Sequence, residues 1–300
     1  MNRTFRPTHK DPAPGAVCAI GAFTIWGLIP VFYKAVGHLP ALEVLAHRVV
    51  WSMVVLGILF IISQVIRKGP HPHPPRGIRY LFISTMLVTT NWLLVIWAVQ
   101  AGRVLEVSLG FFINPLVSVA LGLVFLRERL NFRQILAVGL AVVGVANLLA
   151  AHGEWPWVSL GLALSFGFYG LVRKKVAVDP LYGLVIETGL MTPVALGFLI
   201  VLAWQGRGAF WQFNPQTDIL LFLTGPTSVT PLLLFLVGVK RLRLTTVGLV
   251  QYIAPTLNFL LAVLAYHEAF TPAHLVTFGC IWLGLVVYSL DLYQTGRKTG

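Results

Sequence analysis

The sequence predicts an all-α integral membrane protein, with ten transmembrane helices arranged as two inverted repeats of five helices. Composition, the number of long apolar runs and an internal repeat each point to this fold. The 300 residues are 57% hydrophobic and only 11% charged, and the mean hydropathy is +0.82. A soluble domain of this length is far more polar, so the composition is typical of a membrane protein.

An internal repeat relates the two halves of the chain. The segment from Val107 to Leu130 and the segment from Val247 to Phe270 match at one common offset. The matching pairs within them are Leu109 and Leu249, Ile113 and Ile253, Pro115 and Pro255, and Glu128 and Glu268. Elsewhere the same offset pairs Lys34 with Lys174, Pro40 with Pro180, Arg103 with Arg243, Gly139 with Gly279, and Gly144 with Gly284. This many matches at one spacing, without a gap, indicate a tandem duplication.

Ten apolar runs are long enough to cross a membrane. A hydrocarbon core about 30 Å thick needs ~20 apolar residues in a helix. The first five runs are Gly15–Val36, Ala41–Ile66, Ile78–Val99, Leu105–Leu126 and Gln134–Ala150. The second five are Trp155–Val172, Leu181–Ala203, Asp218–Val239, Thr245–Tyr266 and Ala273–Leu292. Five crossings per half bring the second half into the membrane from the opposite face, so the repeat must be inverted.

Basic residues set the predicted orientation. With the N-terminus in the cytoplasm, the outside segments hold only Lys34, Arg103 and Arg207, and the inside segments hold nearly all the other basic residues. Because Lys and Arg side chains resist translocation, both termini are expected to be cytoplasmic. The net charge of +12 is then a topology signal that also attracts anionic lipid, and no nucleic-acid partner is expected.

The predicted organisation has two repeats between short tails. A cytoplasmic tail is expected at 1–14, the first repeat at 15–150, the second repeat at 155–292 and a C-terminal tail at 293–300. The first apolar run is long enough to span and lacks a convincing cleavage site. It is therefore expected to be an uncleaved helix rather than a signal peptide.

Enzyme, metal and cofactor signatures are missing from the sequence. The pair His267-Glu268 is not followed by a second histidine at the spacing of a zinc-binding helix, and no nucleophile elbow or phosphate-binding glycine loop occurs. Two histidines lie between prolines in the stretch from Gly69 to Arg76, which is expected to be a stiff cytoplasmic linker. We therefore expect no catalytic residues, no metal site and no cofactor.

Prolines interrupt several of the predicted spans. They are Pro30, Pro115, Pro193, Pro226, Pro231 and Pro255. Each removes one backbone donor and frees the carbonyl four residues earlier. A packing kink is the simplest interpretation, and we prefer it for Pro193. Pro115 and Pro255 hold equivalent positions in the two repeats beside polar residues, so they are expected to be hinges that line a cavity.

Two charged residues, Arg48 and Glu187, lie well inside predicted spans. Arg48 is about seven residues from the outer end of its run, and Glu187 is a similar distance from the inner end of its own, so the two are not expected to meet. The expected partners are Glu43 or Glu106 for Arg48, near the outer face, and Arg173 or Lys174 for Glu187, near the inner face. Such pairs are equally compatible with a structural contact between helices and with a role in transport.

Aromatic and amide side chains inside the spans are the candidate substrate contacts. The faces of Trp and Tyr rings suit a solute with an apolar or aromatic side chain, and amides supply directional hydrogen bonds. The candidates are Trp26, Tyr33, Asn91, Trp92, Asn114, Tyr169, Gln251, Tyr252 and Asn258. Some aromatic residues of these spans are expected to be anchors at the membrane surface instead.

Five stretches carry a resemblance to a known family. They are His47–Ser52, Asn91–Val99, Glu106–Leu116, Phe168–Lys175 and Gln251–Leu257. They resemble the RarD group of the drug/metabolite transporter superfamily, whose members contain two EamA repeats, and the resemblance covers nearly the whole chain. It implies a ten-helix exporter of the bacterial inner membrane. Related members, YddG-type proteins among them, export amino acids, while the RarD name is tied to chloramphenicol sensitivity. The chain departs from the small multidrug subgroup, because its first predicted span lacks the acidic residue that couples protons there.

Together these observations predict an alternating-access exporter of amino acids, aromatic ones included, with a central cavity between the two repeats. The alternatives are an exporter of drugs such as chloramphenicol or of other metabolites and, less favoured, a membrane protein without transport activity. The expected partners are a small-molecule substrate and the lipid bilayer, and a monomer is compatible with this architecture. The physiological substrate and any coupling to an ion stay open.

Overall fold

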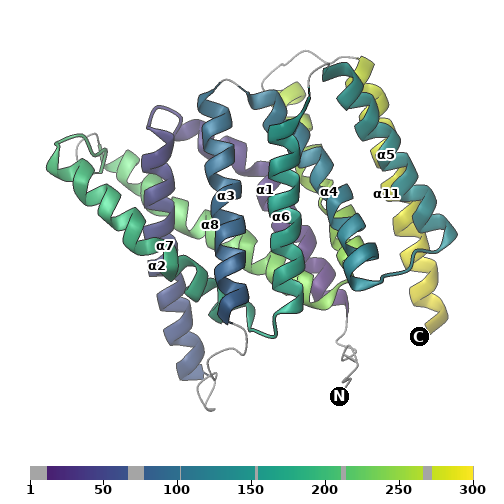
Figure 1. Ribbon diagram of the computed structural model, residues 1–300, viewed down its shortest axis with the longest axis horizontal. Helices are drawn as coiled ribbons and strands as arrows, with labels where there is room; N and C mark the ends of the chain where they lie inside the picture. Colours follow the sequence, from purple (N-terminus) through teal and green to yellow (C-terminus); the bar gives the residue numbers. More distant parts are fainter. Residues whose placement is uncertain are drawn as a thin grey trace.

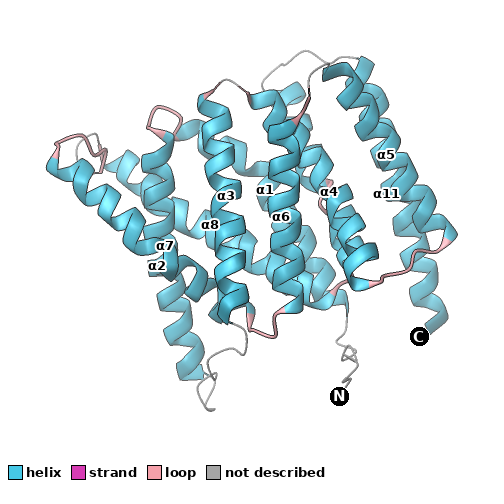
Figure 2. Cartoon of the chain, viewed as in Figure 1, coloured by secondary structure: helices cyan, strands magenta, loops and turns pink. Residues whose placement is uncertain are grey.

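The computed structural model describes residues 12–66, 78–101, 103–152, 155–210, 214–265 and 272–299, in which helices are joined by short loops and turns (Figure 2). The first-half helices are α1 (Pro12–Ala35), α2 (Ala41–Ile66), α3 (Ile78–Gln100), α4 (Val104–Leu126) and α5 (Phe132–His152). The second-half elements are α6 (Trp157–Lys175), α7 (Pro180–Trp204), α8 (Pro215–Arg241), α9 (Leu244–Val250), α10 (Ile253–Leu260), the π-helix η1 (Leu261–Ala265) and α11 (Pro272–Thr299). The predicted linker Gly69–Arg76 and residues 1–11 of the predicted tail at 1–14 lie outside the described residues, and residues 12–14 of that tail belong to α1.

Seven helices, α1 to α5, α7 and α8, are long and apolar enough to cross a membrane. α6 is shorter and ends in the basic residues Arg173, Lys174 and Lys175, which lower its hydropathy. α11 contains a shorter apolar stretch from Leu275 to Asp291. These helices confirm an all-α membrane protein.

The predicted helix from Thr245 to Tyr266 is wrong as a single element. α9 ends at Val250, two turn residues follow, and α10 begins at Ile253 before giving way to η1. Pro255 has no N–H for the carbonyl of Gln251, which instead accepts from Ala254 at 3.1 Å. The regular helical hydrogen bonding is therefore interrupted at this point.

Side-chain caps fix several of the helix ends. Asp179 accepts the backbone N–H groups of Leu181 and Tyr182 at the start of α7, and Asn214 caps α8 in the same way. In both helices the next residue is a proline, which needs no partner there. The carboxylate of Glu128, just past the end of α4, accepts the first two N–H groups of α9 at 2.7 and 2.9 Å. This contact joins equivalent segments of the two halves.

The helices α5 and α11, equivalent in the sequence repeat, lie side by side along one edge of the molecule (Figure 1). A Cβ atom on Gly144 would lie 2.9 Å from the carbonyl oxygen of Thr277, and a Cβ on Gly284 would lie 2.8 Å from that of Ala137. The repeat offset converts the first contact into the second. Because the contacts advance along α5 while they go back along α11, the two helices are antiparallel. Equivalent helices that run in opposite directions are what an inverted repeat requires.

Other helix contacts also come in pairs, in which the repeat offset converts one contact into the other. α1 packs against α8, and their counterparts α6 and α3 pack together. α4 packs against α6, and the α9–α10 segment packs against α1 in the equivalent way. The close approaches behind these contacts are equivalent too, since Gly167 lies against Val117 and Gly27 lies against Leu257. Glycine allows helices to approach closely, which matters in lipid, where apolar burial does not drive helices together.

Candidate functional site

A narrow cavity lies between α2 and α3 of the first half and α7 and α8 of the second. It is lined by Arg48, Val49, Ser52, Trp92, Leu184, Thr188, Met191, Ser228, Val229 and Leu232. In this conformation it has room for about one water molecule. Because α7 and α8 are the counterparts of α2 and α3, the cavity is built from the same two helices of each repeat.

The sequence repeat places equivalent residues on this lining. At the repeat offset, Arg48 corresponds to Thr188 and Trp92 corresponds to Leu232. All four residues line the cavity. The duplication therefore places two pairs of equivalent positions on the lining, whereas the side chains of each pair differ between the halves. The first half supplies a charge and an aromatic ring, and the second supplies a hydroxyl and an aliphatic group.

The guanidinium carbon of Arg48 lies 4.1 Å from the centre of the Trp92 ring. This distance is typical of a cation–π contact. The acidic residues expected beside Arg48 contact other groups: Glu106 pairs with Arg103 at 2.7 Å, and Glu43 accepts the backbone N–H of Ala209. The structure places the Arg48 guanidinium beside Trp92 of α3, and its expected pairing with Glu43 or Glu106 stays a prediction.

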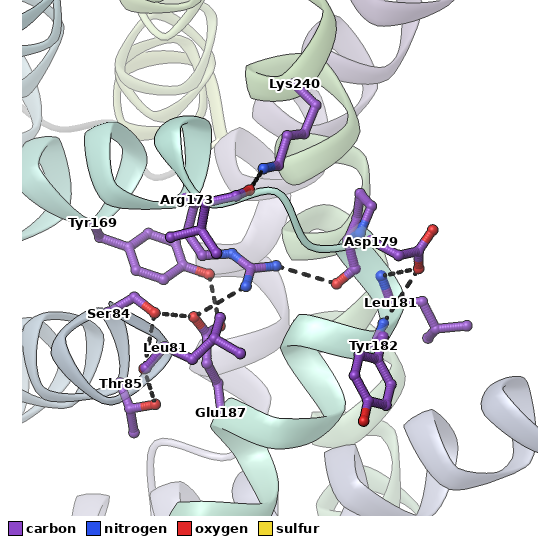
Figure 3. A network of polar contacts seen from close by, with 12 residues as sticks. Leu81, Ser84, Thr85, Tyr169, Arg173, Asp179, Leu181, Tyr182, Glu187 and Lys240 are labelled. Atoms are coloured by element: carbon purple, nitrogen blue, oxygen red, sulfur yellow. Dashed lines mark hydrogen bonds and ion pairs between the residues drawn. The ribbon is translucent and has the colours of Figure 1, made fainter. Parts of the chain in front are cut away.

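Glu187 is held in a buried polar network beside the cavity (Figure 3). Its carboxylate lies 3.4 Å from Nη1 of Arg173, accepts from the hydroxyl of Tyr169 at 3.2 Å and accepts from Ser84. Arg173 also donates from Nη2 to the carbonyl of Pro180 at 3.2 Å. Arg173 is one of the two partners expected for Glu187. The network ties α3, α6 and α7 together, while the neighbouring residues of α7 face the cavity.

Two of the aromatic candidates belong to a packed cluster. The Trp26 ring contacts Phe166 at 5.8 Å and Phe235 at 5.7 Å between ring centres, and the Tyr169 ring stacks on Phe235 at 6.4 Å. This cluster fills the space between α1, α6 and α8 and belongs to the same core as Trp92, Leu184 and Leu232. Of the aromatic candidates that the structure describes, Trp92 lines the cavity.

The amide candidates mainly join helices. Asn91 donates to the carbonyl of Leu162 at 2.9 Å and to Ser165 at 3.0 Å, and Gln251 accepts from Ser118 at 3.2 Å. Other polar atoms are buried without a hydrogen-bond partner in the described part of the chain, namely Oδ1 of Asn114, Oδ1 of Asn258 and the hydroxyl of Tyr252. The side chain of Tyr33 lies outside the described residues. Substrate contact by all these residues stays a prediction.

The two predicted hinges differ in structure. α4 continues through Pro115 to Leu126, whereas Pro255 follows directly on the interruption between α9 and α10. The carbonyl oxygen of Pro115 would lie 2.7 Å from a Cβ on Gly248, so α4 and α9 approach closely here. The hinge role stays a prediction, which labelling of single cysteines in Pro115→Ala and Pro255→Ala variants would test.

Three hydroxyl residues of the lining were not among the substrate contacts predicted from the sequence. They are Ser52, Thr188 and Ser228. Serine and threonine are common inside apolar helices, so nothing in their local sequence distinguishes them. For Thr188 a signal was present, because it is the repeat counterpart of Arg48.

Comparison with known proteins assigns the family. The model of the EamA-like transporter family matches residues 13–150 and again 155–290. An uncharacterized transporter of Vibrio cholerae is 44% identical, with 97% of both chains covered. Protein RarD of Escherichia coli is 43% identical, with 97% of this chain and 98% of the relative covered. A solved crystal structure matches in fold alone, with a TM-score of 0.70 at 16% identity over 93% of this chain and 98% of its own.

The fold and the family model define a multi-pass membrane transporter. The chain belongs to the EamA-like transporter family, in the RarD group of the drug/metabolite transporter superfamily. Its apolar helices and its bacterial relatives place it in the bacterial inner membrane.

Proposed function

We propose that the protein exports amino acids, aromatic ones included, by alternating access through the cavity between its two repeats. The observation that carries this proposal is the cavity itself, because α2 and α3 meet their counterparts α7 and α8 around Arg48 and Trp92. A charged residue deep inside a span is costly and is retained where it meets a solute or another charge. The proposal includes ten membrane crossings, with both termini in the cytoplasm.

Two barriers would have to open in turn for transport. The aromatic cluster around Trp26 and Phe235 and the polar network around Glu187 both lie beside the cavity. The two halves also differ in shape, since α4 is continuous and its counterpart is divided into α9 and α10. An inverted repeat in which the halves exchange such shapes would alternate the side to which the cavity opens.

The lining suits an amino acid with an apolar side chain. Leu184, Met191, Val229 and Leu232 provide apolar surface, and Trp92 provides an aromatic ring. Arg48 and the hydroxyl residues provide the directional contacts. All of these residues come from one chain, so a monomer would contain a complete site.

An exporter of drugs or of other metabolites is the second candidate. It is favoured by a relative from Pseudomonas aeruginosa that is 31% identical over 95% of this chain and is named chloramphenicol-sensitive protein RarD. The apolar lining would also accept a neutral drug.

Efflux from loaded vesicles separates these candidates. Vesicles that contain the protein are expected to release phenylalanine faster than empty vesicles, and Trp92→Ala should slow phenylalanine release about tenfold more than alanine release, because ring contacts are lost. Trp157→Ala is the control, since this ring is 45% exposed and lies outside the cavity. Release of chloramphenicol without release of any amino acid would favour the second candidate, and release of neither would argue against transport.

Labelling of single cysteines tests the orientation. In a variant that lacks Cys18 and Cys280, a cysteine at the exposed Ala177 is expected to be shielded from an impermeant thiol reagent in intact cells. A cysteine at the exposed Gln205, after α7, is expected to react. These expectations follow from the basic residues Arg173, Lys174 and Lys175, which precede Ala177. The reverse pattern would contradict cytoplasmic termini.

A further inference from the structure

The two repeats contribute side chains of different size to the cavity. In both pairs of equivalent positions on the lining, the first half has the larger side chain. Arg48 corresponds to the shorter Thr188, and the indole of Trp92 corresponds to the smaller side chain of Leu232. Equivalent side chains would leave equal room on both sides of the cavity. The smaller ones leave more room beside α7 and α8, so this side is where the apolar group of a solute fits.

Leu232 differs from the other aliphatic residues of the described lining. Its repeat counterpart, Trp92, also lines the cavity, whereas the counterparts of the others do not. The counterpart of Leu184, for example, is Val44, which belongs to a separate core cluster. The duplication therefore keeps the position of Leu232 at the cavity in both halves, and the first half has an aromatic ring there.

The core behind Leu232 holds its side chain in place. Leu232 is 5% exposed and belongs to the same core cluster as Tyr169, Phe235 and Leu236. Side chains in a close-packed core interdigitate, so one of them has little space into which it could withdraw. Met191, on the same lining, is unbranched and adapts its shape more easily. A group that enters the cavity therefore meets Leu232 as a fixed wall.

We infer that Leu232 limits the size of the apolar side chain that the cavity accepts. This inference rests on the proposed function, because it assigns the substrate selectivity of the same cavity. Leu232 and Trp92 both line a space with room for about one water molecule, so a substrate side chain packs between them. A shorter residue at position 232 then admits a larger ring, and a longer residue excludes the ring of phenylalanine.

Release of tryptophan, phenylalanine and alanine from loaded vesicles tests the inference. The ratio of two release rates does not depend on the amount of active protein. Leu232→Ala is expected to raise the ratio of tryptophan release to alanine release at least about tenfold, because space for the indole is gained. Leu232→Phe is expected to lower the ratio of phenylalanine release to alanine release about tenfold. Calorimetry on the purified full-length protein should show tighter binding of L-tryptophan to the Leu232→Ala variant.

Leu236→Ala is the matched control. Leu236 is 0% exposed in the same core cluster, lies one turn further along α8 and is not on the lining. This variant loses the same atoms, so thermal unfolding should show a comparable loss of stability, while both release ratios stay at their native values. If Leu232→Ala fails to fold, Leu232→Val carries the test, with an expected rise of about threefold in the ratio of tryptophan to alanine release.

The outcomes separate this inference from the proposed function. Export of phenylalanine by the native protein, together with unchanged ratios in the Leu232 variants, would overturn the inference alone. Equal changes of the ratios in Leu232→Ala and Leu236→Ala would also overturn it, because they would show a general effect of the core. If neither the native protein nor any variant releases an amino acid, the proposed function fails and the inference fails with it.

Discussion

Replacement of Arg173 by alanine is expected to lower the free energy of unfolding by about 3–5 kcal/mol, because it leaves the carboxylate of Glu187 buried without its cation. The side chains of Arg173 and Glu187 are only 1% and 2% exposed, and their closest charged atoms are 3.4 Å apart. Tyr169 and Ser84 also contact the carboxylate, so the loss of the Arg173 side chain would weaken the packing of α3, α6 and α7. The measurement is unfolding of the purified protein in a denaturant titration.

An ion pair of the same chemistry whose arginine is exposed provides the control. Arg243 is 42% exposed and lies 3.9 Å from Glu128. Arg243→Ala is therefore expected to cost at most about 1 kcal/mol. The double variant Arg173→Met with Glu187→Leu should recover most of the stability, because it removes both charges from the apolar interior. Equal losses in Arg173→Ala and Arg243→Ala would show that the buried network does not hold these helices together.

Replacement of Gly225 by alanine is expected to separate α2 from α8 and to abolish most transport. A Cβ atom at this position would lie 2.6 Å from the carbonyl carbon of Trp51 and 2.8 Å from its oxygen. Both atoms are backbone and cannot rotate away, so a helix must shift, at a cost of about 1–3 kcal/mol. Trp51 precedes Ser52, which lines the cavity beside Arg48, so the shift would reach the substrate contacts. The measurements are unfolding and vesicle efflux.

Gly57, on the same helix as Trp51, is the matched control. A Cβ atom there would have no neighbour within 4 Å, so Gly57→Ala should leave both stability and efflux unchanged. If Gly225→Ala were as active as Gly57→Ala, the close contact of α2 and α8 would not be needed for transport.

The positions of the helices could largely be predicted from the sequence. The predicted run Ala41–Ile66 coincides with α2, and the predicted run Leu181–Ala203 lies within one residue of both ends of α7. Helix length in a membrane follows from the thickness of the hydrocarbon core, and charged or capping residues mark the ends. The duplication was equally visible, and the antiparallel contacts of α5 and α11 are of the kind that the inversion predicted from an odd number of helices per half requires.

The candidate site was predicted less well, because the direction of each side chain was not visible in the sequence. Glu187 is buried, and Arg48 and Trp92 are half-buried on the cavity lining; an acidic partner was expected for Arg48, whose guanidinium lies over the Trp92 ring. Trp26 and Tyr169 carry the same aromatic signal as Trp92 and instead pack against Phe235. Similarly, Asn91 donates to the carbonyl of Leu162 and so joins α3 to α6, while its contact with substrate stays a prediction.

The sequence by itself determined that the protein lies in a membrane, where its helices are and that the chain contains two repeats. Each of these depends on local hydropathy and on spacing along the chain. Only the tertiary structure decided which faces meet around the cavity. In lipid an apolar helix surface is about as stable against acyl chains as against another helix, so hydropathy does not specify packing partners. Partners are fixed by close approaches, such as that of Gly225 to Trp51, and by buried polar contacts, such as that of Glu187 with Arg173. Both depend on residues far apart in sequence, which become neighbours only after the helices have packed.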